Sequence, residues 1–453
     1  MIRAGKAGPD SAWPEALIAS VRNLPAHSGL YVALSGGLDS VLLLHTLVRH
    51  VRNSDRLTAV HVNHQLQPNA GETESFCRRL CDALSVPCQI RRVEVSATPS
   101  GNFPGTGGLE EAAREARYQA FRSCLEDNDL LVMAHHADDQ TETVLFRLLR
   151  GTGVAGLGGM PVIRVLGNGT LYRPFLNFSR QQLEAWAREL SVDWVEDPSN
   201  QDQRFDRNYL RKTIIPALKE RWPSLNRRLA STARACSESD EIARSLGSLH
   251  FSRCGTADGG LDLSLLAGLT LVEQKNLIRW WVGRQQCSPP SLADWRGLMS
   301  DFIDSGDDRQ PEYCGDDYVI RRHQNTLYLV KGQAVTGDEG AQVLPGQETA
   351  WGEWRLQLQA ANADSGTAPE LRVFLRQGGE RIRARAGGPS KSLKNWLQEQ
   401  AVPAWERSSL PLVKDTASDK HELVAVGHLW ISEHYSGKAP ASGWRLILER
   451  ESD

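Results

Sequence analysis

The stretch Leu30-Tyr-Val-Ala-Leu-Ser-Gly-Gly-Leu-Asp-Ser-Val-Leu-Leu-Leu44 decides the fold class of this chain. Its apolar beginning, Leu30–Leu34, predicts a buried strand, and Ser40–Val48 predicts the helix that follows. Between them, Gly36 and Gly37 can take positive φ and let backbone N–H groups approach a ligand closely. A glycine-rich turn from strand to helix is typical of an anion site. We therefore predict a phosphate-binding loop made of Ser35, Gly36, Gly37, Leu38, Asp39 and Ser40.

The loop lacks the lysine of ordinary P-loop NTPases, because no Gly-x-x-x-x-Gly-Lys occurs in the chain. That lysine grips the terminal phosphates of the nucleotide. Its absence favours cleavage between the α and β phosphates. The alternative is an ordinary tight turn between a strand and a helix, without a ligand.

Further alternation of apolar runs and amphipathic stretches predicts a doubly wound parallel α/β sheet. The other predicted strands are Leu57–Val62, Gln89–Val95 and Leu130–Ala134, and the other predicted helices are Glu72–Leu84, Leu109–Leu125 and Asp138–Arg150. After the sheet we expect helices at Ser179–Leu190, Asp206–Arg221 and on to about Ser305. A small α+β domain follows, with strands at Trp354–Leu358 and Leu371–Leu375 and a helix at Ser392–Glu399.

Length and composition fit a soluble protein of several domains. The chain has 453 residues, of which 40% are hydrophobic and 24% charged. We expect a catalytic domain at 1–217, a helical domain at 218–333, a linker with strands at 334–369 and a C-terminal domain at 370–453. No apolar stretch is long enough to span a bilayer and the first ten residues do not resemble a secretory signal, so we expect a cytoplasmic protein without a membrane partner. The net charge of −3 does not by itself indicate nucleic acid.

A second cluster is Ala134-His-His-Ala-Asp-Asp-Gln-Thr-Glu-Thr143. His135 and His136 follow a predicted strand, at the edge where open α/β sheets bind ligands. Asp138 and Glu142 are one helical turn apart, so both carboxylates can face one pocket. With Asp139, they suit a Mg²⁺–phosphate complex or a substrate ammonium group. The alternative is that Asp138 only caps the helix.

Basic residues form two further groups. Arg114 and Arg117 could either form salt bridges along a helix or bind a carboxylate or phosphate. In the C-terminal domain, seven basic residues lie close together in the chain, and Trp396 and Trp405 follow them: Arg372, Arg376, Arg381, Arg383, Arg385, Lys391 and Lys394. Basic side chains near exposed aromatic rings can hold RNA, although a charge run is more often only a solvated surface.

Together these stretches resemble the tRNA(Ile)-lysidine synthetases, a family with the PP-loop, adenine-nucleotide alpha-hydrolase-like fold. Further matching stretches are His61–His64, Ala113–Tyr118, Arg150–Met160, Arg173-Pro174, Glu196–Asn200, Arg207-Asn208, Lys391–Trp396 and Val402–Arg407. One departure is Gln67, where family members often carry an arginine shortly after the His-Val-Asn-His stretch.

The resemblance implies a two-step ligase reaction that uses ATP and Mg²⁺. ATP adenylates the oxygen on carbon 2 of the wobble cytidine in tRNA(Ile) with a CAU anticodon, and pyrophosphate leaves. The ε-amine of L-lysine then replaces AMP and forms lysidine, so that decoding switches from methionine to isoleucine. A homodimer remains an open alternative.

The resemblance also implies roles for individual residues. Asp39 and Asp139 would support Mg²⁺ and the phosphates, and Arg207 would neutralise phosphate charge. Asp138 and Glu142 would bind the ammonium groups of lysine, with Arg117 on its carboxylate or on the adenylate. The target cytidine would enter at the loop containing Arg150, Gly151, Gly153 and Gly156. The tRNA-binding residues of the C-terminal domain would be Arg381, Arg383, Lys391 and Lys394.

Three other functions compete with this interpretation. A PP-loop tRNA thiolase generally needs paired cysteines, and the chain has no Cys-x-x-Cys. A PP-loop amidotransferase would need a glutaminase domain before the loop. A non-enzymatic RNA-binding protein would explain the basic C-terminal residues but would leave the histidine and acid cluster without a purpose.

Overall fold

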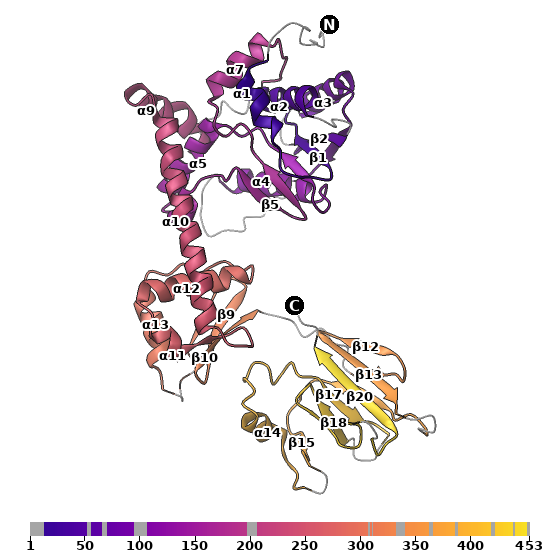
Figure 1. Ribbon diagram of the computed structural model, residues 1–453. Coiled ribbons are helices and arrows are strands. Elements are labelled where there is room, and N and C mark those ends of the chain that lie inside the picture. The colour runs from indigo at the N-terminus through magenta and orange to yellow at the C-terminus, as the bar shows by residue number, and fades with distance from the viewer. Residues whose placement is uncertain are drawn as a thin grey trace. The chain divides into compact units, whose positions relative to one another are not determined.

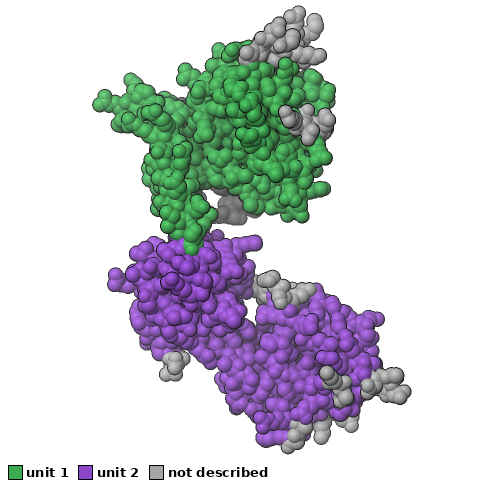
Figure 2. Space-filling model, in the orientation of Figure 1, with its two compact units in different colours: residues 1–245 green, residues 246–453 purple. Residues whose placement is uncertain are grey.

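The computed structural model describes residues 13–51, 56–65, 70–94, 107–196, 206–306, 309, 311–331, 340–361, 366–385, 388–417, 422–437 and 440–450. The chain divides into two compact units, residues 1–245 and residues 246–453 (Figure 1, Figure 2). Not one helix in the described ranges combines the length and the apolar character needed to cross a membrane.

A six-stranded sheet forms the centre of unit 1 (Figure 1). Its strands are β1 Leu30–Ala33, β2 Leu57–Asn63, β3 Cys88–Arg92, β4 Leu130–Val132, β5 Ile163–Leu166 and β6 Gly169–Tyr172. Their order in space is β3-β2-β1-β4-β6-β5. Neighbouring strands are parallel, except that β5 lies antiparallel to β6 at one edge. The carboxyl ends of the parallel strands therefore share one edge of the sheet.

Two hydrophobic cores cover the two faces of this sheet. Leu30 and Val32 belong to one core and Ala33 to the other, because successive side chains of a strand point to opposite faces. Helices α1, α2, α3 and α7 complete the first core and α4 completes the second. These helices and their neighbours are α1 Glu15–Arg22, α2 Leu38–His50, α3 Ala70–Leu84, α4 Gly107–Arg122, α5 Ala137–Leu149, α6 Val154–Leu157 and α7 Arg180–Glu189. The predicted doubly wound fold is confirmed.

The helix after β1 begins two residues earlier than predicted, at Leu38. Gly37 is its N-cap, in an extended conformation. Ser40 lies inside the first turn, where its hydroxyl accepts from the Ser35 N–H at 3.1 Å and donates to the Gly37 carbonyl at 2.9 Å. Asp39 thus starts the helix at the carboxyl edge of the sheet.

The segment predicted as one helix from Asp206 to Arg221 is interrupted. It consists of α8 Asp206–Tyr209, a π-helical turn Leu210–Ile214, and α9 Ile215–Arg221. Pro216 has no N–H to donate to the carbonyl four residues earlier, and a wider turn accommodates this missing donor. The long helix α10, Leu225–Cys254, follows.

Unit 2 holds a helical part and a strand-rich part. The helical part contains α11 Leu263–Ala267, α12 Leu271–Arg284 and α13 Trp295–Asp304 beside a sheet of β7 Leu261–Asp262, β8 Glu312–Cys314, β9 Tyr318–His323 and β10 Thr326–Lys331. The strand-rich part contains α14 Leu393–Glu399 and the strands β11 Ala341–Val343, β12 Glu348–Trp351, β13 Trp354–Ala360, β14 Leu371–Phe374, β15 Arg381–Ile382, β16 Lys391–Ser392, β17 Leu412–Asp415, β18 Glu422–Val426, β19 Trp430–Ile431 and β20 Trp444–Arg450. The expected helical stretch and α+β architecture are both present.

The two glycines of the loop should respond differently to alanine. Gly36 has φ +85°, and an added Cβ would approach Thr73 Cγ2 to 3.0 Å and Cys77 Sγ to 3.3 Å. Gly37 has φ −78°, and its Cβ would meet only Ser35 Oγ at 3.5 Å. We expect Gly36→Ala to lower the free energy of unfolding by about 1–3 kcal/mol. Gly37→Ala should leave it within about 0.5 kcal/mol. Urea unfolding compares the two variants, and equal losses would contradict the predicted strain at Gly36.

Candidate functional site

An open cavity of about 930 Å³ lies at the carboxyl ends of β1, β2 and β4. This is the edge where open α/β sheets bind ligands, and the volume suits a nucleotide. The sequence-predicted residues on its lining are Ser35, Gly37, Leu38, Asp39, Ser40, Arg117, Asp138 and Asp139. The fold therefore brings the glycine loop and the acid cluster to one cavity.

The glycine loop is held in shape by its own serines and by a distant segment. Ser35 Oγ accepts from the Gly37 N–H at 3.3 Å and contacts Ser40 Oγ at 3.0 Å. The Gly36 carbonyl accepts from the Val195 N–H at 2.9 Å. The first turn of α2 follows, and its N–H groups are the natural donors to an anion at this end of the cavity.

The N-terminus of α5 supplies the opposite, acidic wall. His136 is the N-cap, and it forms a capping box with Asp139 through contacts of 3.0 Å and 3.4 Å. The alternative interpretation that Asp138 caps this helix is wrong. Asp138 instead accepts from the Arg180 backbone N–H at 2.7 Å and from Lys219 Nζ.

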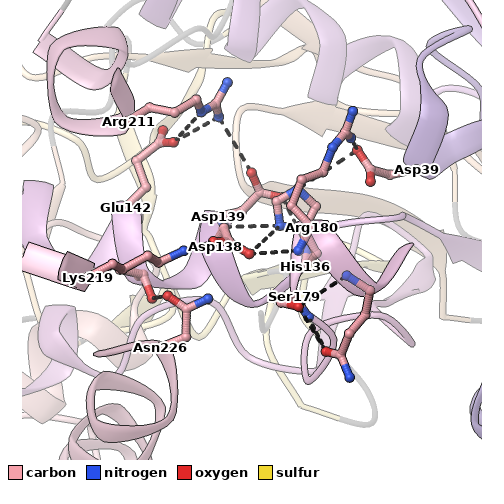
Figure 3. Close-up of polar contacts among 12 residues, drawn as sticks. Asp39, His136, Asp138, Asp139, Glu142, Ser179, Arg180, Arg211, Lys219 and Asn226 are labelled. Carbon is pink, nitrogen blue, oxygen red and sulfur yellow. Dashed lines mark hydrogen bonds and ion pairs between the residues drawn. The ribbon is translucent and has the colours of Figure 1, made fainter. Parts of the chain in front are cut away.

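Together with Asp39 on α2, the carboxylates of α5 form what we call the acidic wall, and each of them is matched by a protein cation (Figure 3). Arg180 binds Asp39, and Lys219 binds Asp138. Arg211 lies 2.8 Å from Glu142 and 3.5 Å from Asp139. The three cations come from α7, the π-helical turn and α9.

Sequence reasoning did not single out Arg180 or Lys219. For Asp206–Lys212, which contains Arg211, the sequence leaves open whether the basic side chains form salt bridges or bind a carboxylate or phosphate. The only signal was the basic character of Asp206–Lys212. These cations meet the acids only in the tertiary structure, because Lys219 is 81 residues from Asp138 along the chain.

Burial and charge act differently on the individual acids. Burial raises the pKa of Asp39 by more than His136 and Arg180 lower it. Burial likewise raises the pKa of Glu142 despite Arg211. For Asp138, burial works upward, but the hydrogen bonds from Lys219 and the Arg180 backbone lower its pKa overall.

Two histidines of the cavity have lowered pKa values. Burial lowers the pKa of His135 to about 3, and nearby Arg173 works in the same direction. Burial also lowers the pKa of His64 to about 4, with Arg117 donating to its Nε2 at 3.2 Å. Both rings can therefore exchange hydrogen bonds at neutral pH without adding positive charge.

One carboxylate oxygen of Asp39, which lines the cavity, is unpaired in the described residues. Asp39 Oδ1 is buried and has no hydrogen-bond partner among the described residues, although Oδ2 binds Arg180. In the same ranges, no three His, Cys, Asp or Glu side chains gather in an arrangement that would hold a metal by themselves.

Other predicted site residues do not reach the cavity lining in the described part of the chain. Glu142 is buried and held by Arg211. Arg207 and Arg150 both lie over the Phe146 ring at 5.2 Å.

The loop with Gly151, Gly153 and Gly156 contains α6 and packs on α5. Arg147 Nη1 donates to the Gly156 carbonyl at 3.0 Å. Gln67 and residues 197–200 lie outside the described residues.

The predicted basic residues of unit 2 are partly neutralised. Lys391 pairs with Glu399, and Arg381 donates to the Ser390 carbonyl. Arg383 and Lys394 are exposed. Trp396 is buried in the core of the strand-rich part, so the expectation of an exposed aromatic ring there is wrong.

Comparison with known proteins agrees with this geometry. Residues 14–218 match the family model described as PP-loop domain, which defines unit 1 as a PP-loop ATP-binding protein. Residues 261–328 and 371–448 match the models described as TilS substrate binding domain and TilS substrate C-terminal domain. The chain belongs to the tRNA(Ile)-lysidine synthase family.

Two relatives illustrate the extent of the similarity. The tRNA(Ile)-lysidine synthase of Alkalilimnicola ehrlichii is 36% identical over 451 residues, which cover 96% of this chain and 97% of that protein. The tRNA(Ile)-lysidine synthase of Pseudomonas aeruginosa is 38% identical over 433 residues, 92% of each chain.

The raised pKa of Asp39 predicts a trade-off between stability and ligand binding. Above the ordinary pKa of aspartate, about 4, the fold disfavours the ionised carboxylate. Asp39→Asn should therefore stabilise the ligand-free chain at pH 7. This gain should shrink as the pH falls, because the folded wild-type protein then takes up the proton. Urea unfolding at pH 7 and at a pH near the ordinary pKa of aspartate measures the difference in stability, with the exposed Asp82→Asn on α3 as the control. An Asp39→Asn variant less stable than wild type at pH 7 would contradict it.

Proposed function

We propose that this chain forms lysidine in tRNA(Ile). In the first step the oxygen on carbon 2 of the wobble cytidine attacks the α phosphorus of ATP, and the bond to pyrophosphate breaks. In the second step the ε-amine of L-lysine attacks carbon 2, and the bond from carbon 2 to the AMP oxygen breaks. The observation that carries the proposal is the single cavity that joins the glycine loop to the acidic wall.

The loop from Ser35 to Ser40 and the first turn of α2 bind the phosphates of ATP. Serine hydroxyls and backbone N–H groups supply donors there, in place of the lysine of ordinary P-loop enzymes. Asp39 and Asp139 are the residues that would hold Mg²⁺, since Asp39 Oδ1 is buried and free of partners in the described residues. Mg²⁺ bound to ATP would neutralise the charge of the departing pyrophosphate.

Asp138 and Glu142 bind the ammonium groups of lysine. Lys219 supports this assignment for Asp138, because its own primary ammonium already lies on that carboxylate. Arg211 covers Glu142 and would have to move to expose it. Arg117 lines the cavity and can receive the carboxylate of lysine or the adenylate phosphate. Arg207, on α8, neutralises the negative charge that develops on the phosphates of ATP.

The RNA reaches the cavity beside the loop of Arg150, Gly151, Gly153 and Gly156. The second contact is in unit 2, where Arg381, Arg383, Lys391 and Lys394 meet the body of the tRNA. In this proposal, residues 1–217 form the catalytic domain, and residues 218–333 and 370–453 form the domains that bind RNA. The reaction takes place in the cytoplasm.

Radiolabelled lysine tests the function directly. Incubation with Mg²⁺-ATP and unmodified tRNA(Ile) carrying CAU should transfer lysine to the RNA and release AMP and pyrophosphate. The same RNA with uridine at the wobble position should accept none, and Asp39→Ala should abolish AMP release. No transfer by folded wild-type protein would refute the proposal.

Two substitutions in the proposed lysine site should change the KM for lysine in opposite directions. Asp138→Asn should raise the KM for lysine about 10-fold or more, since a charge-assisted hydrogen bond contributes about 1.5–3 kcal/mol. Lys219→Gln should lower that KM by about 3-fold, because an internal competitor for Asp138 is gone. The KM for ATP should change little in both. If both variants raise the KM for lysine, Lys219 builds the site and does not compete for it.

A further inference from the structure

Three arginines surround one buried tyrosine beside the cavity, and a fourth lies close to them. Arg114 on α4 and Arg164 on β5 lie over the ring of Tyr118, at 5.1 Å and 4.7 Å from its centroid. Arg147 on α5 and Arg173 after β6 complete the group, which we call the arginine cluster. The four residues come from four different elements, so only the fold brings them together.

Acidic partners of the arginine cluster are absent from the described residues. Within the described residues, none of its four members forms an ion pair. The neutral partners of Arg147 are the carbonyls of Gly156 and Gly159, at 3.0 Å and 2.8 Å. Arg173 donates to the carbonyl of Pro161. The acidic wall is the opposite case, because each of its carboxylates has a cation (Figure 3).

Neighbouring positive charges lower the pKa values of groups in the cluster. Burial lowers the pKa of Arg147, and the charges of Arg114, Arg207 and Arg164 lower it further. The pKa of Tyr118 is lowered although its burial works upward, because Arg114, Arg173 and Arg164 surround it. A cation-rich site of this kind gains free energy when an anion enters it.

The cluster adjoins the cavity without lining it. Arg173 Nε donates to His135 Nδ1 at 3.3 Å, and His135 lines the cavity. Arg114 lies one helical turn before Arg117, which also lines it. Arg147 holds the loop that we assign to the entry of the cytidine. An RNA strand whose base enters the cavity would therefore leave its backbone near the cluster.

We propose that the arginine cluster binds the phosphodiester backbone next to the target cytidine. This proposal rests on the proposed function. Arg147 and Arg173 are fixed to carbonyls and build the site. Arg114 and Arg164 are half-buried, and the described residues offer no partner to the buried Nε of Arg164, so these two side chains make the contact. Arginine forks match phosphate oxygens in geometry and charge.

The salt dependence of tRNA binding tests this site. Arg114→Gln and Arg164→Gln, singly and together, are titrated with unmodified tRNA(Ile) at several KCl concentrations. Each lost phosphate contact should reduce the slope of log K against log salt by about 1. The double variant should bind about 10- to 100-fold more weakly at about 0.1 M salt. The affinity of the double variant for ATP should be unchanged. This result would show that the two arginines bind the phosphates of RNA and not those of ATP.

Two control variants sharpen the test. Arg122→Gln removes an arginine of the same helix that is already paired with Glu115 at 2.7 Å, so the salt slope should stay at the wild-type value. Arg114→Lys with Arg164→Lys keeps the charge and should keep most of the slope.

The outcomes separate three cases. A wild-type slope in the double glutamine variant would overturn the proposal. Weaker binding with an unchanged slope, seen also in the lysine variant, would mean that the arginines only pack on Tyr118, and this too would overturn it. If the slope falls as expected but wild-type protein transfers no lysine, the RNA site stands and the proposed reaction fails.

Discussion

The pairing of three carboxylates with three distant cations is the constraint on which the site depends. Asp39, Asp138 and Glu142 lie at the edge of the sheet, where burial opposes their ionisation. Arg180, Arg211 and Lys219 compensate them (Figure 3). For Asp138 the contacts with Lys219 and the Arg180 backbone outweigh burial, whereas for Asp39 and Glu142 burial has the larger effect on the pKa. All three cations come from segments that follow the sheet in the chain, so the site depends on contacts between distant parts of unit 1.

Acidic and basic side chains cluster on different sides of this cavity. In the function we propose, the two clusters bind different groups of the substrates. The acidic wall is paired with protein cations, and in the function we propose it binds ammonium groups and Mg²⁺. The arginine cluster beside the cavity has no ion pair within the described residues, and we propose that it binds phosphate. A net charge of −3 conceals both features, because the acids of the chain outnumber its bases only slightly and the two kinds cluster apart. Net charge was therefore a poor guide to an RNA partner.

Helix α5 shows which features of a helix N-terminus the local sequence predicts and which it does not. A polar residue at its N-terminus was expected, and a capping box is present. The cap is His136 with Asp139, however, because Asp138 is drawn to Lys219 and the Arg180 backbone. Trp396 is a similar case, since a basic neighbourhood suggested exposure whereas the ring packs into a core. In both, a partner from a distant segment overrides the local pattern.

The sequence by itself determined the alternating strands and helices, the phosphate loop after β1 and the acids that open α5, because each depends on neighbours within a few residues. Family membership followed from the order of these motifs. The tertiary structure alone decided which cation meets each acid, which arginines gather around Tyr118, and that Glu142 lies behind Arg211 and away from the cavity. These contacts join segments tens of residues apart, and their geometry is set by helix docking and burial, which no local pattern encodes.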